Sequence, residues 1–236
     1  RFTEAEQHLE AIIEDTGRQG AFDDQARAML ESAVLLRLQS RYAAALRLLE
    51  RLQSTTRHHA AGLWDQVQIE FCRVALEEGN VEVANRHLSQ LADDDKTVLL
   101  RAELSLLTAQ SEQSRRIIRS AISRYSGQLA QLASYHNVIG RSYQLEDNDM
   151  LAAQAFHRAM TLYERNTDLY GHARAQSNLG AVYMRLSNLN LAETLLRQAL
   201  KTQRAIGDRV GAFATQHNLQ YLLRSRVNSE PRGSSL

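Results

Sequence analysis

Apolar residues recur along this chain at the three- and four-residue spacing of amphipathic helices. Within residues 170–209, one such stripe predicts a first helix over 173–186, and a second stripe predicts another helix over 189–206. Ser187-Asn188 separates the two stripes and is expected to form the turn. The apolar positions of the second helix are Ala192, Leu195, Leu196, Ala199 and Leu200. The pattern therefore predicts an antiparallel helix pair.

The same pattern occurs a second time, 40 residues earlier. When residues 130–169 are laid over 170–209, small and aromatic residues coincide, among them Gly140 with Gly180 and Tyr143 with Tyr183. Glycine inside a helix costs about 1 kcal/mol relative to alanine, so we expect these glycines to allow close approach of the paired helix. Helix pairs repeated at a fixed step predict an all-α solenoid.

Weaker copies of the unit precede these two. A first helix over 23–38 and another over 60–77 are each followed by a second helix, with Ala33 and Cys72 in the small-residue position. Gly79-Asn80 is the expected turn of the latter pair. A shorter pair follows over 97–109 and 112–125, and the start of the chain is expected to be an unpaired second helix. The residues of that helix are Phe2, Ala5, Leu9 and Ile12.

These units predict a single elongated domain over 1–226. Its clearest repeats are 130–169 and 170–209, and a helix over 210–226 is expected to cap the C-terminal end of the solenoid. The polar, proline-containing segment 227–236 is expected to be disordered. The chain opens without Met and already inside a helix, which favours a piece of a larger protein.

The two clear units resemble the tetratricopeptide repeat (TPR). The matching residues are Leu179, Gly180, Tyr183, Ala192, Leu196 and Ala199, preceded by Ile139, Gly140, Tyr143, Ala152, Phe156 and Ala159. The step of about 40 is similar to the long-repeat variety of the family, as in MalT-like bacterial regulators and kinesin light chains. The resemblance implies a right-handed superhelix of antiparallel helix pairs.

Composition and charge narrow the range of functions. The chain has 1 Pro and 11 Gly in 236 residues, and its net charge is +1. Residues 1–128 carry 16 Lys+Arg against 19 Asp+Glu, whereas residues 129–236 carry 12 against 8. No stretch is apolar and long enough to span a bilayer, so no membrane partner is expected. The one cysteine cannot form a disulfide within the chain, which favours a reducing, cytoplasmic setting.

Catalytic patterns are not found in the sequence. It has no glycine-rich phosphate loop, no paired-cysteine metal pattern and no His-Glu-x-x-His helix, so neither an enzyme nor a cofactor or metal site is expected. We expect Cys72 to be a small buried residue and the adjacent His58 and His59 to be exposed. The run Asp93-Asp94-Asp95 is expected to cap the next helix.

Candidate binding residues lie on the first helices. The TPR resemblance implies a concave groove in which an Asn two residues before the Gly holds the backbone of a bound peptide. Asn178 and Asn218 match it, whereas the 130–169 unit has Val138 there, with Asn137 beside it. The neighbouring groove positions are expected to be Arg141, Arg174, Arg185, His217, Tyr221 and Arg224. We expect Arg115, Arg116 and Arg119 to form a solvated patch on an outward-facing second helix.

Two functions fit these features. The first is a non-catalytic protein-protein interaction domain whose groove binds a protein or peptide segment, with an acidic segment favoured by the arginines. The alternative is the effector-sensing domain of a MalT-like transcription activator, which binds a small molecule. Basic residues do not recur at one place in every unit, so nucleic acid is not an expected partner.

Overall fold

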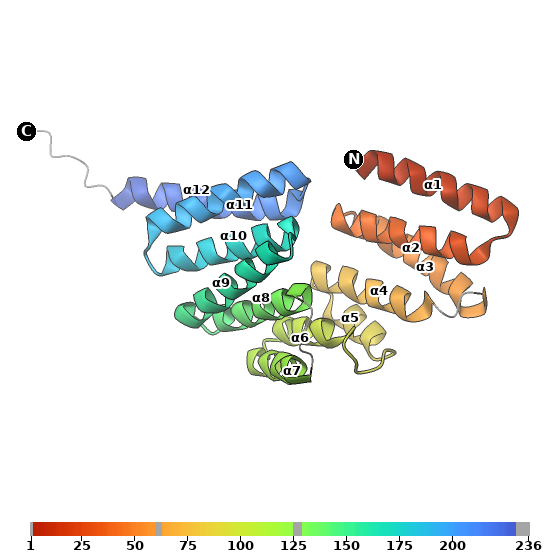
Figure 1. The fold of residues 1–236 in the computed structure, drawn as a ribbon, viewed down its shortest axis with the longest axis horizontal. Helices are drawn as coiled ribbons and strands as arrows, with labels where there is room; N and C mark the ends of the chain where they lie inside the picture. Colours follow the sequence, from red (N-terminus) through yellow and green to blue (C-terminus); the bar gives the residue numbers. More distant parts are fainter. Residues whose placement is uncertain (1, 60–62, 125–128, 230–236) are drawn as a thin grey trace, which may run out of the picture. The chain divides into compact units, whose positions relative to one another are not determined.

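The structure is a computed structural model that describes residues 2–59, 63–124 and 129–229 (Figure 1). In this part of the chain all regular structure is helical. The helices are α1 (Phe2–Gln19), α2 (Phe22–Leu38), α3 (Tyr42–His59), α4 (Trp64–Glu78), α5 (Val81–Leu88), α6 (Val98–Leu107), α7 (Ser111–Arg124), α8 (Leu129–Leu145), α9 (Asp149–Arg165), α10 (Leu169–Arg185), α11 (Leu189–Ile206) and α12 (Arg209–Ser229). The predicted all-α class is confirmed.

The chain divides into two compact units. Unit 1 is Arg1–Thr108 and contains α1 to α6, and unit 2 is Ala109–Leu236 and contains α7 to α12. In unit 2 each helix from α7 to α12 packs against the next one along the chain, as Figure 1 shows for α8 to α12. The single domain over 1–226 stays a prediction. Of the predicted tail, residues 227–229 belong to α12 and residues 230–236 lie outside the described residues.

The helix pairs share one spacing of small buried residues, which we call the repeat register. Each first helix carries a small buried residue, and a second small buried residue follows twelve positions later in the paired helix. These pairs are Ala33 with Ala45, Cys72 with Ala84, Gly140 with Ala152, and Gly180 with Ala192. A Cβ atom on Gly180 would lie 2.9 Å from Leu196 Cγ, closer than real Cβ contacts allow. The glycine therefore permits a close helix crossing, as predicted.

The turns within the pairs follow the same register. Seven residues after each of these small positions, the backbone takes a positive φ, at Ser40, Gly79, Asp147 and Ser187. An Asn comes next in three of these turns and caps the second helix, and Asn80 Oδ1 accepts a hydrogen bond of 3.1 Å from Val83 N. The predicted turns at 79–80 and 187–188 are thus confirmed.

Two predicted details are wrong. The run Asp93–Asp95 does not cap a helix, because α6 begins at Val98 and its N-cap is Thr97, which makes no side-chain cap bond. Asp94 Oδ1 instead accepts from Lys96 N at 3.0 Å within its own turn. Arg115 does not belong to a solvated patch, since its side chain is only 7% exposed. The side chains of His58 and His59 lie outside the described residues.

Arg115 is buried because it joins α7 to the end of α8. Its two terminal nitrogens donate to the two carboxylate oxygens of Glu146, each at 2.8 Å, and one of them also donates to Glu112 at 2.7 Å. The guanidinium also lies 4.6 Å from the centre of the Tyr143 ring. The hydrogen bonds that Arg115 donates to Glu146 are the main cause that raises the pKa of Arg115.

Candidate partner-binding faces

The exposed stripe of α10 begins the candidate groove of unit 2. Tyr170, Arg174 and Arg185 are exposed along this stripe, and Asn178 and Ala181 between them are partly exposed. Their spacing of three and four residues places them on one side of the helix. The residues on the other side are buried against neighbouring helices, including Ala173, Ser177 and Gly180. The stripe is therefore the surface that α10 offers to a partner.

The same positions on α8 and α12 extend this surface. At the step of 40, Arg141 and Tyr221 correspond to Ala181, while Val138 and Asn218 correspond to Asn178. Arg141 and Asn218 are partly exposed, Tyr221 is 66% exposed, and Val138 is buried. We call this surface the groove face of unit 2. Its positions are 130, 134, 138, 141 and 145 on α8, 170, 174, 178, 181 and 185 on α10, and 210, 214, 218, 221 and 225 on α12.

The amide of Asn178 links two first helices. Its Nδ2 donates a hydrogen bond of 3.1 Å to Oδ1 of Asn137, and Asn137 is buried on the side of α8 that faces α10. Among the described residues, Asn178 Oδ1 accepts no hydrogen bond. One end of this amide is thus fixed in place by the protein, while its oxygen remains able to accept from a backbone N–H.

The charges of the groove face are all positive. None of its positions is Asp or Glu, and it carries Arg141, Arg174 and Arg185. The guanidinium of Arg174 lies 5.4 Å from the centre of the Tyr170 ring, which orients it along the surface. Arg185 is paired with the carboxylate of Asp149, so it is less available to a ligand than the sequence suggested.

His217 and Arg224 lie on a different side of α12 from the groove face. They share a stripe with Arg209, Phe213 and Gln220, at spacings of three and four residues. We call these five residues the end face of α12. Phe213 is 78% exposed, although a helix that caps a solenoid is expected to present polar residues outward. Sequence analysis missed Phe213, and its alignment with the buried Ala133 and Ala173 is the signal that could have identified it.

Unit 1 has a cavity at the corresponding place on its own first helices. It has a volume of about 490 Å³ and lies between α2, α4 and Lys96. Both apolar and charged side chains line it. The lining residues are Leu30, Glu31, Val34, Gln66, Ile69, Glu70, Arg73 and Lys96. Its size is within the range of ligand-binding pockets, and it was not predicted from the sequence.

Glu70 holds the position in α4 that Asn178 holds in α10, two residues before the small residue. Its side chain is only 2% exposed and its carboxylate is shared by two arginines. Arg37 Nε donates to Oε1, and Arg73 donates to Oε2 at 3.3 Å. Burial disfavours the charge of Arg37, but Glu70 and Glu77 more than offset this, so the pKa of Arg37 is raised. The charges of Glu70 and Arg37 are therefore paired within the fold and are not available to a ligand.

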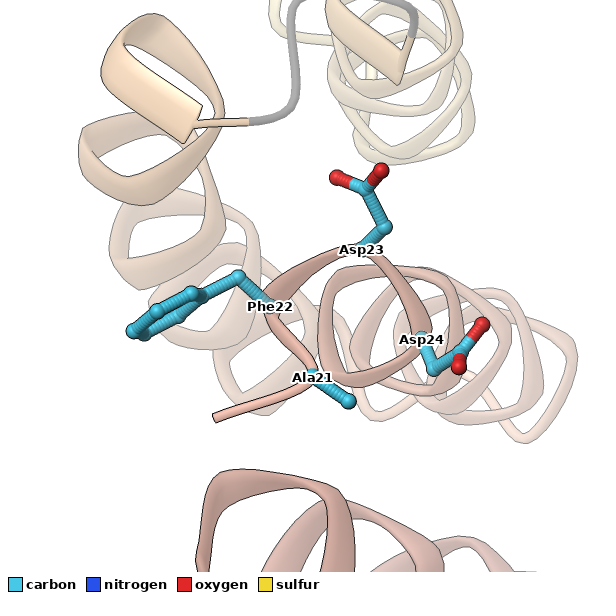
Figure 2. Close-up of a pocket in the computed structure, with 4 residues that line it drawn as sticks. All are labelled: Ala21, Phe22, Asp23 and Asp24. Atoms are coloured by element: carbon cyan, nitrogen blue, oxygen red, sulfur yellow. The ribbon is translucent and has the colours of Figure 1, made fainter. Parts of the chain in front are cut away.

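A second hollow of about 340 Å³ lies at the start of α2. Figure 2 shows the carboxylates of Asp23 and Asp24 on different sides of the first turn, with the ring of Phe22 pointing away from both. Acidic residues in the first turn of a helix are favourable to the helix dipole. Their arrangement is explained by helix stability.

Cys72 lies in the small-residue position that sequence analysis assigned to it. It is fully buried, and its Sγ lies 3.5 Å from the carbonyl oxygen of Ala84 in the paired helix. Burial raises the pKa of the thiol from 9.0 to about 12. The thiolate needed for nucleophilic chemistry is therefore strongly disfavoured.

Solved structures with the same architecture are TPR proteins. TTC0263, a thermophilic TPR protein of Thermus thermophilus, matches with a TM-score of 0.62 and 19% identity, over 81% of this chain and 98% of that chain. NprR in complex with its cognate peptide NprX matches with a TM-score of 0.60 and 14% identity, over 99% of this chain and 74% of that chain.

A chain of the APC/C hetero-tetramer Cut9-Hcn1 matches with a TM-score of 0.53 and 13% identity, over 92% of this chain and 46% of that chain. No protein-family model matches the sequence, and no curated protein matches it. The fold is thus a TPR-like solenoid of helix pairs, as predicted. Within the described residues, no helix combines the length and apolar character needed to cross a membrane.

Proposed function

We propose that the chain is a non-catalytic protein-protein interaction domain, and that the groove face of unit 2 binds an extended segment of a partner protein. The observation that carries this proposal is the shared exposed stripe in which Asn178 and Asn218 recur beside arginines and no carboxylate. A partner segment with acidic residues fits this charge pattern best. The expected parent is a larger regulatory protein.

The two kinds of polar group on the groove face have separate tasks. The amides of Asn178 and Asn218 would hydrogen-bond the backbone of the bound segment, which fixes its direction but not its sequence. Arg141 and Arg174 would pair with carboxylates of the segment, which selects acidic sequences. The exposed ring of Tyr221 adds apolar contact area with a polar tip.

Support for a peptide ligand comes from the match with NprR, which was solved in complex with its cognate peptide NprX. At 14% identity this match shows a common fold alone. The peptide therefore indicates what such a fold is able to bind. Which residues of this chain bind a peptide must therefore be argued from its own groove face.

The alternative function is an effector-sensing domain of the MalT-like, long-repeat kind, with a small molecule as ligand. The observation that favours it is the cavity of about 490 Å³ in unit 1, whose apolar walls are Leu30, Val34 and Ile69. A small effector would fill this cavity, whereas a peptide would follow the groove face of unit 2. The two functions thus predict binding in different units.

The test compares the affinity of variants for one probe, a fluorescein-labelled peptide of alternating acidic and aromatic residues. We expect Asn178→Ala with Asn218→Ala to weaken binding about tenfold at any salt concentration, because each amide contacts backbone. Arg141→Ala with Arg174→Ala should weaken it mainly at low salt, since exposed charges are screened over about 10 Å at 0.1 M. Fluorescence anisotropy measures both effects.

The matched control is Arg116→Ala with Arg165→Ala, which removes two exposed arginines from the second helices α7 and α9. This control should leave the affinity of the probe within about twofold of wild type. Equal weakening by the control and by the asparagine variant would mean that charge alone attracts the peptide, and the groove proposal would be wrong.

A further inference from the structure

Among the described residues, the end face of α12 is open, whereas the same face of the earlier first helices α8 and α10 is covered. Ala133 of α8 is fully buried and packs in one cluster with Ala159 and Tyr163 of α9 and with Ala175 of α10. Phe213 holds the corresponding position in α12 and is 78% exposed. A side chain of this size in water costs free energy that burial would recover.

Residues beside Phe213 enlarge the apolar surface. Tyr221 is 66% exposed and Val210 is 52% exposed, and both lie within one helical turn of an end-face residue. Exposed apolar groups that gather on one element, bordered by polar residues, are typical of a protein interaction site. The end face therefore has the composition of a contact surface.

The charges of α12 indicate the kind of partner. Residues 209–229 contain no Asp or Glu, and Arg209 and Arg224 stand at the two ends of the end face. Among the described residues, neither arginine has a hydrogen-bond or ion-pair partner. A second copy of α12 would oppose these arginines with arginines, which is unfavourable. A helix with acidic residues near both ends would pair with them.

The small-residue position of α12 adds a steric condition. Gly140 and Gly180 let the second helix cross closely, and a Cβ atom on Gly140 would lie 2.6 Å from the ring of Phe156. Gln220 takes this position in α12, so a helix cannot approach as closely as within the regular pairs. A wider crossing leaves room for the side chains of Phe213 and Tyr221 between the two helices.

We propose that the end face of α12 docks an acidic amphipathic helix of a partner protein, in the place that a second helix occupies in the regular pairs. Phe213 would insert among the apolar residues of the partner helix, and Arg209 and Arg224 would pair with its carboxylates. This site borders the groove face at Val210 and Tyr221, but Phe213, Arg209 and Arg224 lie on another side of α12. The partner helix would be recognised by its apolar side chains at helical spacing, and not by hydrogen bonds to its backbone.

The experiment uses the whole chain and a defined probe, a helix-locked, fluorescein-labelled peptide with the sequence of residues 2–19. This sequence contains five acidic residues and one arginine, and its Ala5, Leu9, Ile12 and Ile13 follow the apolar pattern of a second helix. Anisotropy titration should show saturable binding. Phe213→Ser should weaken it at least about tenfold, as expected for an anchor residue. Arg209→Glu with Arg224→Glu should weaken it as well, and less so at high salt.

Three controls separate this site from others. Phe22→Ser removes an exposed aromatic ring from the start of α2 in unit 1 and should leave the affinity unchanged, as should Asn178→Ala in the groove face. A probe in which the five acidic residues are replaced by lysine should bind at least about tenfold more weakly, because it loses the charge pairs. Equal binding of the two probes would overturn the acidic character of the partner.

Other outcomes overturn the proposal in other ways. No binding of the probe, or binding that Phe213→Ser leaves unchanged, would show that the end face is not a docking site. Light scattering on the chain alone tests for a second copy. If it detects dimers that Phe213→Ser abolishes, the occupant is another copy of this chain and not an acidic partner. Loss of the Asn178-dependent affinity of the groove probe would leave the end-face result standing.

Discussion

The two units build their first helices on the same register but use the groove positions in opposite ways. Unit 1 carries 12 Lys+Arg against 18 Asp+Glu, and unit 2 carries 16 against 9. In unit 1 the position two residues before the small residue is Glu70, which is buried and paired with Arg37 and Arg73. In unit 2 the same position is Asn178, which is partly exposed and has an open acceptor.

This difference separates structural polar groups from groups available to a partner. A buried carboxylate with two arginine partners contributes to the fold, and removal of one partner leaves the remaining buried charge less well compensated. An amide that is half-satisfied at the surface contributes little to the fold but retains hydrogen-bonding capacity for a ligand. The repeat register alone therefore does not identify a binding residue, because burial decides which role the position has.

The largest expected effect comes from a pair of substitutions at that one register position. Glu70→Ala should lower the free energy of unfolding by about 3 kcal/mol, because the buried Arg37 loses one of its two carboxylate partners and keeps only Glu77. Asn178→Ala removes one hydrogen bond and should cost about 1 kcal/mol. Urea denaturation followed by circular dichroism measures both. Equal costs would contradict the contrast between the two units.

A control for this pair is Glu82→Ala on α5, which removes an exposed ion pair of 2.8 Å with Arg86. Exposed pairs of this kind are worth about 0–1 kcal/mol, so the control should be nearly neutral. If Glu82→Ala were as costly as Glu70→Ala, the loss of any carboxylate in unit 1 would explain the result.

The second expected effect concerns the helix crossing that both units share. Gly180→Leu should cost about 1–3 kcal/mol or more, because its Cβ would lie 2.9 Å from Leu196 Cγ and 3.4 Å from the Ala192 carbonyl oxygen. The matched control is Ala205→Leu, an exposed position on α11. A melting temperature of Gly180→Leu within a degree of the control would show that the packing register of unit 2 is wrong.

The sequence predicted what depends on local pattern. The bounds of α11 are those of the predicted helix 189–206, and the burial of Cys72 follows from its place in the repeat. It could not predict contacts between distant residues. Arg37 and Glu70 are 33 positions apart, and the burial of Arg115 depends on Glu146 in another helix. From the sequence alone, a charged residue on a helix is expected to be exposed, because its ion-pair partner is not known.

The candidate groove face of unit 2 was predicted in part, because the helical register can be read from the sequence. The helical register placed Asn178, Asn218 and Arg174 on one stripe, as the geometry shows. His217 and Arg224 were predicted to share the groove face, but their spacing of one and three positions from Asn218 and Tyr221 points their side chains to another stripe of α12, and their role stays a prediction. Whether any of these residues binds a partner stays a prediction.

The smallest expected effect tests a feature common to both units, a histidine whose pKa is lowered by burial. Burial lowers the pKa of His87 in unit 1 and of His136 in unit 2 below the usual 6.5. His87 is stacked on Phe71 with ring centres 4.2 Å apart, and its Nδ1 lies 2.7 Å from Gln68 Oε1. Protonation therefore occurs more readily in the unfolded chain than in the folded one.

The sign of the pH dependence follows from this lowered pKa. Above pH 6.5 both states hold neutral histidine, so the contribution to stability is fully present, and it is lost as pH falls from 6.5 through the lower folded pKa. We therefore expect the free energy of unfolding to fall between pH 7 and pH 5. His87→Gln, which keeps a hydrogen-bonding side chain, should reduce this loss, and His136→Gln should reduce it by a similar amount. If His87→Gln has the same acid sensitivity as wild type while His136→Gln does not, proton uptake on unfolding belongs to His136 of unit 2 and not to His87 of unit 1.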